Sequence, residues 1–124
     1  MNIAEIKVLI CDDSIMVRKK IADFLRAAGV AEIYEAKDGV QAVEMYKQHS
    51  PDLAFMDIVM PLKTGLEALV EIKQFDPAAR VVMASTVGTQ GNLVAAIKAG
   101  AYEFLQKPLR EEDILRLLDK ILKV

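Results

Sequence analysis

The sequence is poor in cysteine and has no long hydrophobic run, and both features narrow the class of protein. A single cysteine, Cys11, among 124 residues excludes an internal disulfide and is consistent with a reducing compartment. No apolar run approaches the roughly 20 residues of a membrane-spanning helix. The first residues also lack the charged start and apolar stretch of a secretion signal. We therefore expect a cytoplasmic protein that does not enter a membrane, with Cys11 as a small core residue.

The sequence also lacks a basic stripe, internal repeats and low-complexity linkers. Its 16 lysine and arginine residues are scattered and its formal net charge is -2, so we do not expect nucleic acid as a partner. The densest basic cluster, Arg18-Lys19-Lys20, lies within a helical pattern, and we interpret it as a solvated helix face. With 124 residues, 53% of them hydrophobic and 27% charged, we expect one compact domain over residues 1–124. We also expect this domain to be a monomer.

Short apolar runs alternate with helical patterns along the chain. The apolar runs predict strands at residues 7–11, 32–36, 53–57, 80–84 and 102–106. Helices are predicted between Ser14 and Gly29, from Gly39, from Gly65 to Asp76, from Gln90 to Ala99 and from Glu111 onward. Because the connections are short, this alternation predicts an α/β fold, a doubly wound sheet of five parallel strands covered by five helices.

Polar side chains follow four of the predicted strands at the point where each strand ends. Since the carboxyl ends of parallel strands meet at one edge of a sheet, these side chains should lie together in the ligand crevice. They are Asp12 and Asp13 after the first strand, Asp57 after the third, Ser85 and Thr86 after the fourth, and Lys107 after the fifth.

The gathered carboxylates require a positive charge nearby. At close range each pair would repel by roughly a few kcal/mol at an effective dielectric constant near 20. Carboxylate oxygens suit Mg²⁺, and Lys107 offers a second positive charge. Taken singly, Asp57 could cap a loop, Asp12 and Asp13 could be helix-dipole acids, and Lys107 could be solvated. Their joint placement at successive strand ends favours a functional site.

These residues resemble the receiver domain of bacterial two-component response regulators, over essentially the whole chain. The resemblance rests on Asp12-Asp13, the segment from Asp57 to Met60-Pro61, Ser85 and Lys107-Pro108. It is closest to the stand-alone, CheY-like chemotaxis type, and it implies the flavodoxin-like strand order 2-1-3-4-5 that CheY has. It also implies a phosphoprotein that acts in signal transduction and is not an enzyme.

The resemblance implies a role for each carboxylate. Asp57 would accept a phosphoryl group from a sensor histidine kinase or a small phosphodonor. Asp13 and Asp57 would bind Mg²⁺ directly, Asp12 would act mainly through water, and the backbone carbonyl of Val59 would complete the protein ligands.

The resemblance also implies a switch and a control of signal lifetime. Lys107, next to an expected cis peptide bond to Pro108, would pair with the phosphoryl oxygens, and Ser85 would donate its hydroxyl to them. Phe104 would rotate inward as Ser85 moves.

Val59 and Val87 would flank the path of the hydrolytic water. Because neither side chain can hold water, we expect slow self-dephosphorylation. In the family, Ala or Gly is common at the position of Thr86, which affects access for large phosphodonors.

The sequence leaves the output open, and two other protein classes share part of this pattern. The chain ends soon after its last helix, so we expect it to act by binding through the surface of the fourth helix, fifth strand and fifth helix. A flagellar switch protein or another effector, and a phosphatase, are the expected partners besides the kinase. A phosphorelay intermediate, or a receiver cut from a longer regulator, is the alternative.

A haloacid dehalogenase-type phosphatase would need an Asp-x-Asp pattern at Asp57, and a flavodoxin would need a phosphate loop after the first strand; both are absent from the sequence.

Overall fold

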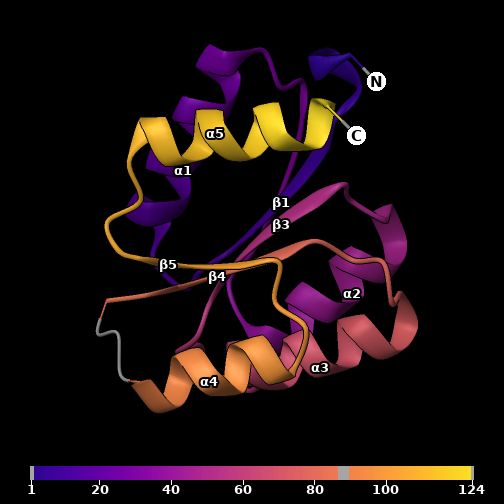
Figure 1. The fold of residues 1–124 in the computed structure, drawn as a ribbon, viewed down its shortest axis with the longest axis vertical. Coiled ribbons are helices and arrows are strands. Elements are labelled where there is room, and N and C mark those ends of the chain that lie inside the picture. Colours follow the sequence, from indigo (N-terminus) through magenta and orange to yellow (C-terminus); the bar gives the residue numbers. More distant parts are fainter. Residues whose placement is uncertain (1, 87–89, 124) are drawn as a thin grey trace.

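A five-stranded parallel sheet lies between two layers of helices in the computed structural model, which describes residues 2–86 and 90–123 (Figure 1). Helices α1 and α5 cover one face of the sheet, and α2, α3 and α4 cover the other. The strands are β1 (Lys7–Cys11), β2 (Glu32–Ala36), β3 (Leu53–Asp57), β4 (Val81–Ser85) and β5 (Glu103–Gln106). The helices are α1 (Ile15–Ala28), α2 (Gly39–His49), α3 (Gly65–Phe75), α4 (Gln90–Lys98) and α5 (Glu111–Leu122), after a short 3₁₀ turn at Ile3–Glu5.

The strand order is β2-β1-β3-β4-β5, and each neighbouring pair is parallel. This order, the number of strands and the α/β class confirm the sequence-based prediction. The element bounds differ from the prediction by one residue in places. Strand β4, for example, extends to Ser85, because Ser85 pairs with Gln106 and its carbonyl accepts a hydrogen bond from the Lys107 N–H at 2.8 Å.

Local side-chain chemistry sets where the helices begin and end. The Ser14 hydroxyl accepts a hydrogen bond from the Val17 N–H and begins α1, and Gly29 ends this helix in a left-handed conformation with φ of 106°. Asp38 caps α2 in the same way as Ser14. Both ends of α1 confirm the prediction made from sequence.

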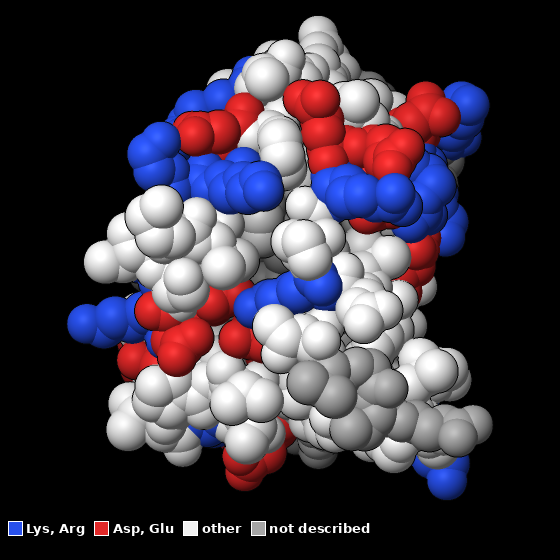
Figure 2. Space-filling view, turned by 90° about the vertical axis from the view of Figure 1, so that its left-hand side faces the viewer, with Lys and Arg blue, Asp and Glu red and all other residues white. Residues whose placement is uncertain are grey.

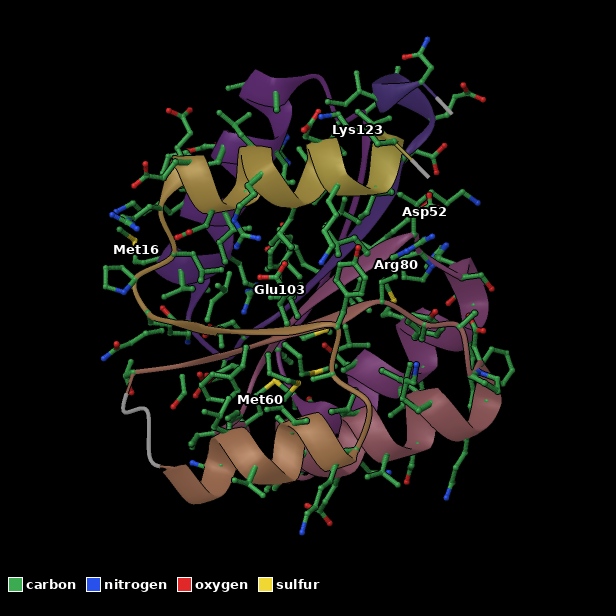
Figure 3. The ribbon with its side chains drawn as sticks, viewed as in Figure 1. Met16, Asp52, Met60, Arg80, Glu103 and Lys123 are labelled. Carbon is green, nitrogen blue, oxygen red and sulfur yellow. The ribbon has the colours of Figure 1, made fainter. Side chains whose placement is uncertain are left out.

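Two apolar clusters hold the helical layers on the two faces of the sheet. Strands β1, β3 and β4 contribute to both clusters, because side chains alternate between the faces. Met60, labelled in Figure 3, belongs to the cluster between the sheet and the layer of α2, α3 and α4. Cys11 is buried in this cluster, and burial raises the pKa of its thiol, as expected for a core residue. In the described part of the chain, no helix is long and apolar enough to cross a membrane.

Two glycines allow the loop after β3 to pack against the first residues of α2 and α3. A Cβ atom at Gly65 would lie 1.9 Å from the Asp57 carbonyl oxygen, and one at Gly39 would lie 2.0 Å from the Lys63 carbonyl oxygen. Both contacts are with backbone, which cannot turn aside as a flexible side chain can. Glycine at these positions therefore keeps the end of β3 in place.

We predict that Gly65→Ala lowers the free energy of unfolding by about 1–3 kcal/mol, because the backbone must shift to admit the methyl group. Gly91→Ala is the matched control, since no heavy atom lies within 4 Å of a Cβ there. This control should be neutral or stabilising by up to about 1 kcal/mol. Urea unfolding of both variants checks the prediction, and equal stabilities would contradict it.

An ion-pair network joins β5 to α5. The Glu103 carboxylate accepts hydrogen bonds from Arg116 Nη1 at 2.8 Å and Nη2 at 3.0 Å, and Lys120 Nζ lies 3.5 Å away. The hydrogen bonds from Arg116 lower the pKa of Glu103, and the charges of Arg116 and Lys120 lower it further. Because the folded-state pKa is depressed, this contribution to stability is present at neutral pH and is lost as the pH falls through the folded-state value.

We predict that Glu103→Gln lowers the free energy of unfolding at pH 7 by about 0.5–1 kcal/mol, as expected for a solvent-screened bidentate pair. The difference from the wild type should shrink once the pH falls below the ordinary glutamate pKa, where the wild-type carboxyl is also neutral. Urea unfolding between pH 7 and pH 3 measures this. A difference that does not change with pH would show that the charge of Glu103 has no part in it.

Candidate functional site

Three carboxylates converge at the carboxyl ends of β1 and β3. Oxygen atoms of Asp12, Asp13 and Asp57 all lie within 4.8 Å of one another. Asp12 is buried, Asp57 is partly buried and Asp13 is exposed. The pairing of β1 with β3 aligns Cys11 with Met56, so the residues that follow these two emerge side by side. The structure therefore brings together the three carboxylates that the sequence placed at this edge.

The ammonium group of Lys107 lies between two of these carboxylates. Its Nζ atom pairs with Asp12 Oδ2, to which it donates a hydrogen bond, and it lies 3.2 Å from Asp57 Oδ2. The side chains of Lys107 and Asp57 are each 11% exposed, so water screens this interaction only in part. Lys107 follows β5 and therefore reaches past β4 to meet the other two strands.

The charges at the site are not balanced by Lys107. Burial raises the pKa of the Asp57 carboxyl, Lys107 lowers it and Asp12 raises it again, and the net result is a raised pKa. Burial lowers the pKa of Lys107. Its hydrogen bond to Asp12 and the charges of Asp12 and Asp57 outweigh this effect, so the pKa is raised overall and the ammonium form is favoured. The three carboxylates thus have one ammonium group among them, which pairs with Asp12 and Asp57. This cluster of hard oxygen donors is compatible with Mg²⁺.

The other predicted site residues follow or lie within β4 and β5. Ser85 is buried at the end of β4, next to Ala84, which pairs with Asp57. Thr86 is exposed. Phe104 pairs with Met83 and packs, partly buried, against the cluster between the sheet and the layer of α2, α3 and α4. The Lys107–Pro108 peptide bond is cis, as the resemblance implied.

Of the two valines assigned to signal lifetime, only Val59 lies within the described residues. Val59 is 73% exposed, and its N–H donates a hydrogen bond to Asp57 Oδ1 at 3.4 Å. It therefore lies beside Asp57 with its side chain open to solvent. Val87 lies outside the described residues, so its assignment stays a prediction.

One residue near the site was misinterpreted from the sequence. Arg18 was grouped with Lys19 and Lys20 as part of a solvated face, but its side chain is only 13% exposed. Its Nη1 donates to the Asp12 carbonyl oxygen at 2.6 Å and its Nε donates to Glu35 at 2.8 Å. The sequence did indicate this inward position, because Arg18 lies four residues after the N-cap Ser14 and three before Ile21, which is buried on the inward side of α1.

The site opens on one face of the molecule. Figure 2 shows this face, where acidic side chains adjoin a central basic side chain, with uncharged side chains around this centre and further charged side chains toward the top of the view. Met16, labelled in Figure 3, lies at this edge of the sheet, and Asp52 and Arg80 lie at the opposite edge. Ile15, Met16, Val59 and Leu62 are between 70% and 82% exposed. The arrangement provides a partly buried carboxylate with a cation beside it, reachable from solvent. It is therefore suited to bind a metal ion and an anionic group together.

Comparison with known proteins places this geometry in a family. The family model of the response regulator receiver domain matches residues 8–119. The chain is 46% identical over 116 residues to the chemotaxis protein CheY of Bacillus subtilis, covering 94% of this chain and 97% of that one. It is 40% identical over 118 residues to the chemotaxis protein CheY of Listeria monocytogenes, covering 95% and 99%.

A solved structure agrees with these relatives. The CheX–CheY–BeF₃–Mg²⁺ complex from Borrelia burgdorferi contains a chain that superimposes with a TM-score of 0.88 at 34% identity, covering 94% of this chain and 89% of that one. The match in sequence, strand order and fold is continuous over nearly the whole domain. The chain belongs to the family of response regulator receiver domains and is of the CheY-like type.

Proposed function

We propose that this chain is a phosphorylated signalling protein that accepts a phosphoryl group on Asp57 from a histidine kinase. The observation that carries the proposal is the position of Lys107 between the carboxylates of Asp12 and Asp57, in a cluster with Asp13 at one edge of the sheet. Such a cluster is costly to stability unless a ligand supplies further positive charge. A site of this kind suits a cation and a phosphoryl group better than a purely structural role.

In the proposed reaction, a carboxylate oxygen of Asp57 attacks the phosphorus atom of the donor. The new O–P bond forms as the bond from phosphorus to the donor's imidazole nitrogen breaks, so the phosphoryl group moves without a net redox change. Lys107, already 3.2 Å from Asp57, would pair with the transferred oxygens. Ser85, at the end of the neighbouring strand, would donate its hydroxyl to them.

The metal site of the proposal uses the same carboxylates. Asp13 and Asp57 would bind Mg²⁺ directly, Asp12 would act mainly through water, and the Val59 carbonyl would be the remaining protein ligand. When bound, Mg²⁺ would neutralise charge on the phosphoryl oxygens during transfer. Asp12 is already held by Lys107 and by the Ser14 N–H at 2.9 Å, which suits an indirect role.

The proposed output is a population shift of the surface formed by α4, β5 and α5. A phosphoryl group at Asp57 would draw Ser85 toward it, and Phe104 would follow inward. Leu93, Val94 and Ile97 are exposed on α4, whereas Ala96 is fully buried, so these three apolar side chains of α4 are available to a partner.

Chemotaxis is the pathway we propose. Support comes from relatives named chemotaxis protein CheY at 46% and 40% identity, aligned over nearly their whole length. We propose a cytoplasmic kinase as donor and a flagellar switch protein as target. In the Borrelia complex, a related regulator is bound to CheX, which supports a further protein partner for this chain. We propose that this partner dephosphorylates it. A phosphorelay intermediate stays the alternative, because it would use the same site.

We predict that Asp57→Asn abolishes phosphoryl uptake and leaves the fold intact, because the amide keeps the size of the side chain but is not a nucleophile. The protein is incubated with Mg²⁺ and acetyl phosphate, and intact mass is measured under acidic conditions. The wild type should gain one phosphoryl group that is stable in acid and labile in base. Release of many equivalents of phosphate would instead indicate a phosphatase.

The matched control is Asp23→Asn, which makes the same chemical change at an exposed position on α1. This variant should take up phosphate like the wild type. Removal of Mg²⁺ with a chelator should abolish uptake in both the wild type and the control. If Asp57→Asn incorporated phosphate at the wild-type rate, the assignment of the acceptor would be wrong.

A second prediction concerns the lifetime of the phosphorylated protein. Val59 is open to solvent beside Asp57 but offers no side-chain hydrogen bond to a water molecule. Val59→Asn should speed self-dephosphorylation about tenfold, because an oriented hydrogen bond lowers the barrier by about 1.4 kcal/mol. Decay of the phosphorylated protein is followed with Mg²⁺ saturating.

Val70→Asn is the control for this experiment, since Val70 is 44% exposed on α3 and the same change there leaves the loop after β3 untouched. Its decay should match that of the wild type. Val87→Glu tests the second assigned position in the same assay. If both Val59→Asn and Val87→Glu decay no faster than the wild type, apolar side chains do not set the lifetime.

A further inference from the structure

The side chain of Arg18 connects three elements at the edge of the acidic cluster. Its Nη1 donates a hydrogen bond to the Asp12 carbonyl oxygen at 2.6 Å, and its Nε donates one to Glu35 Oε1 on β2 at 2.8 Å. Its own backbone N–H donates to the Ser14 carbonyl in the first turn of α1. Arg18 thereby ties α1 and β2 to the loop that carries Asp12 and Asp13.

Each polar atom of Asp12 has a partner in this arrangement. Its N–H donates to the Ala36 carbonyl at 3.0 Å, its Oδ1 accepts from the Ser14 N–H and its Oδ2 pairs with Lys107. The remaining atom, the carbonyl oxygen, accepts from Arg18. This oxygen belongs to the planar peptide unit that joins Asp12 to Asp13, so its hydrogen bond fixes the direction in which Asp13 leaves the strand.

We propose that Arg18 is a positioning residue for the metal site, which holds the peptide between Asp12 and Asp13 so that their carboxylates converge with Asp57. This inference rests on the proposed function, since it concerns the same carboxylates. Arginine suits the role because its planar guanidinium group presents donors in fixed directions to two acceptors at once. Lysine carries the same charge, but its ammonium group lacks this rigid fork.

The direction in which cation affinity changes when Arg18 is substituted distinguishes a positioning role from a purely electrostatic one. The charge of Arg18 is paired with the carboxylate of Glu35, so the pair adds little net charge beside the cluster. If Arg18 acted only through its charge, removing that charge would tighten the binding of a divalent cation. If it acts through the geometry of the loop, both the loss of the fork and the loss of the whole group weaken binding.

The test compares Mg²⁺ binding by the wild type, Arg18→Lys and Arg18→Met, each titrated with MgCl₂ while amide chemical shifts are recorded. The spectrum reports folding and affinity in the same sample, and no phosphodonor is needed. We expect the dissociation constant to rise about tenfold in both variants, the lower end of the range for residues that orient metal ligands. Signals of β3 and β4 residues remote from the site should keep their wild-type positions.

Lys19→Met is the matched control, because it removes one positive charge from the next residue of α1, whose side chain is 67% exposed and pairs with Asp23. Its Mg²⁺ affinity should equal that of the wild type or be slightly higher. Wild-type affinity in Arg18→Lys, or tighter binding in Arg18→Met, would overturn the positioning role. Absence of Mg²⁺ binding by the wild type would instead overturn the metal site of the proposed function.

Discussion

The contact of one lysine with two buried or half-buried carboxylates constrains the whole carboxyl edge of the sheet. Asp12 comes from β1, Asp57 from β3 and Lys107 from β5, so the contact requires three strands to end at one level. Strand β4 lies between β3 and β5, and its last residue, Ser85, accepts the Lys107 N–H at its carbonyl. Any slip in register would leave a charge at this edge without its partner, at a large cost in a partly desolvated site. The geometry of the site therefore depends on the order and register of the strands.

The scaffold meets this requirement through apolar strands and close backbone contacts. Strands β3 and β4 are almost wholly buried, which leaves little freedom for sliding. The loop after β3 is held by glycine at positions 39 and 65, where a side chain would collide with backbone. The carbonyl of Asp57, the residue proposed to react, is one of the groups that Gly65 contacts. Rigidity at the acceptor thus comes from packing around the backbone, while the carboxylate itself stays within reach of solvent.

Much of the fold could be predicted from the sequence because its signals are local. The apolar runs, Ser14 as an N-cap and Gly29 as a stop each act within a few residues, and the parallel arrangement follows from their alternation. The gathering of Asp12, Asp13, Asp57 and Lys107 also followed, since parallel strands end at a common edge. Helical spacing indicated the inward side of α1 for Arg18 but not its partners, because these are a backbone carbonyl and Glu35, an acid on another element that no local pattern connects to it. Likewise, helical spacing shows that α4 has an inward face, but only packing shows that Ala96 is buried and Ile97 is exposed.

The route proposed for the signal depends on the same ladder that positions Lys107. Ser85 and Gln106 are register partners, and two residues earlier Met83 is opposite Phe104. Phe104 is only partly buried, so it has room on the solvent side and an apolar cluster on the other. A side chain placed in this way can have two arrangements of similar free energy, whereas a fully buried residue such as Met83 cannot without opening a cavity. Because β5 is one of the two edge strands, a change in Phe104 would alter the surface beside α4 without disturbing β1 and β3. The structural separation between a rigid acceptor strand and an adaptable edge strand is what would let the domain respond to phosphorylation and keep its fold.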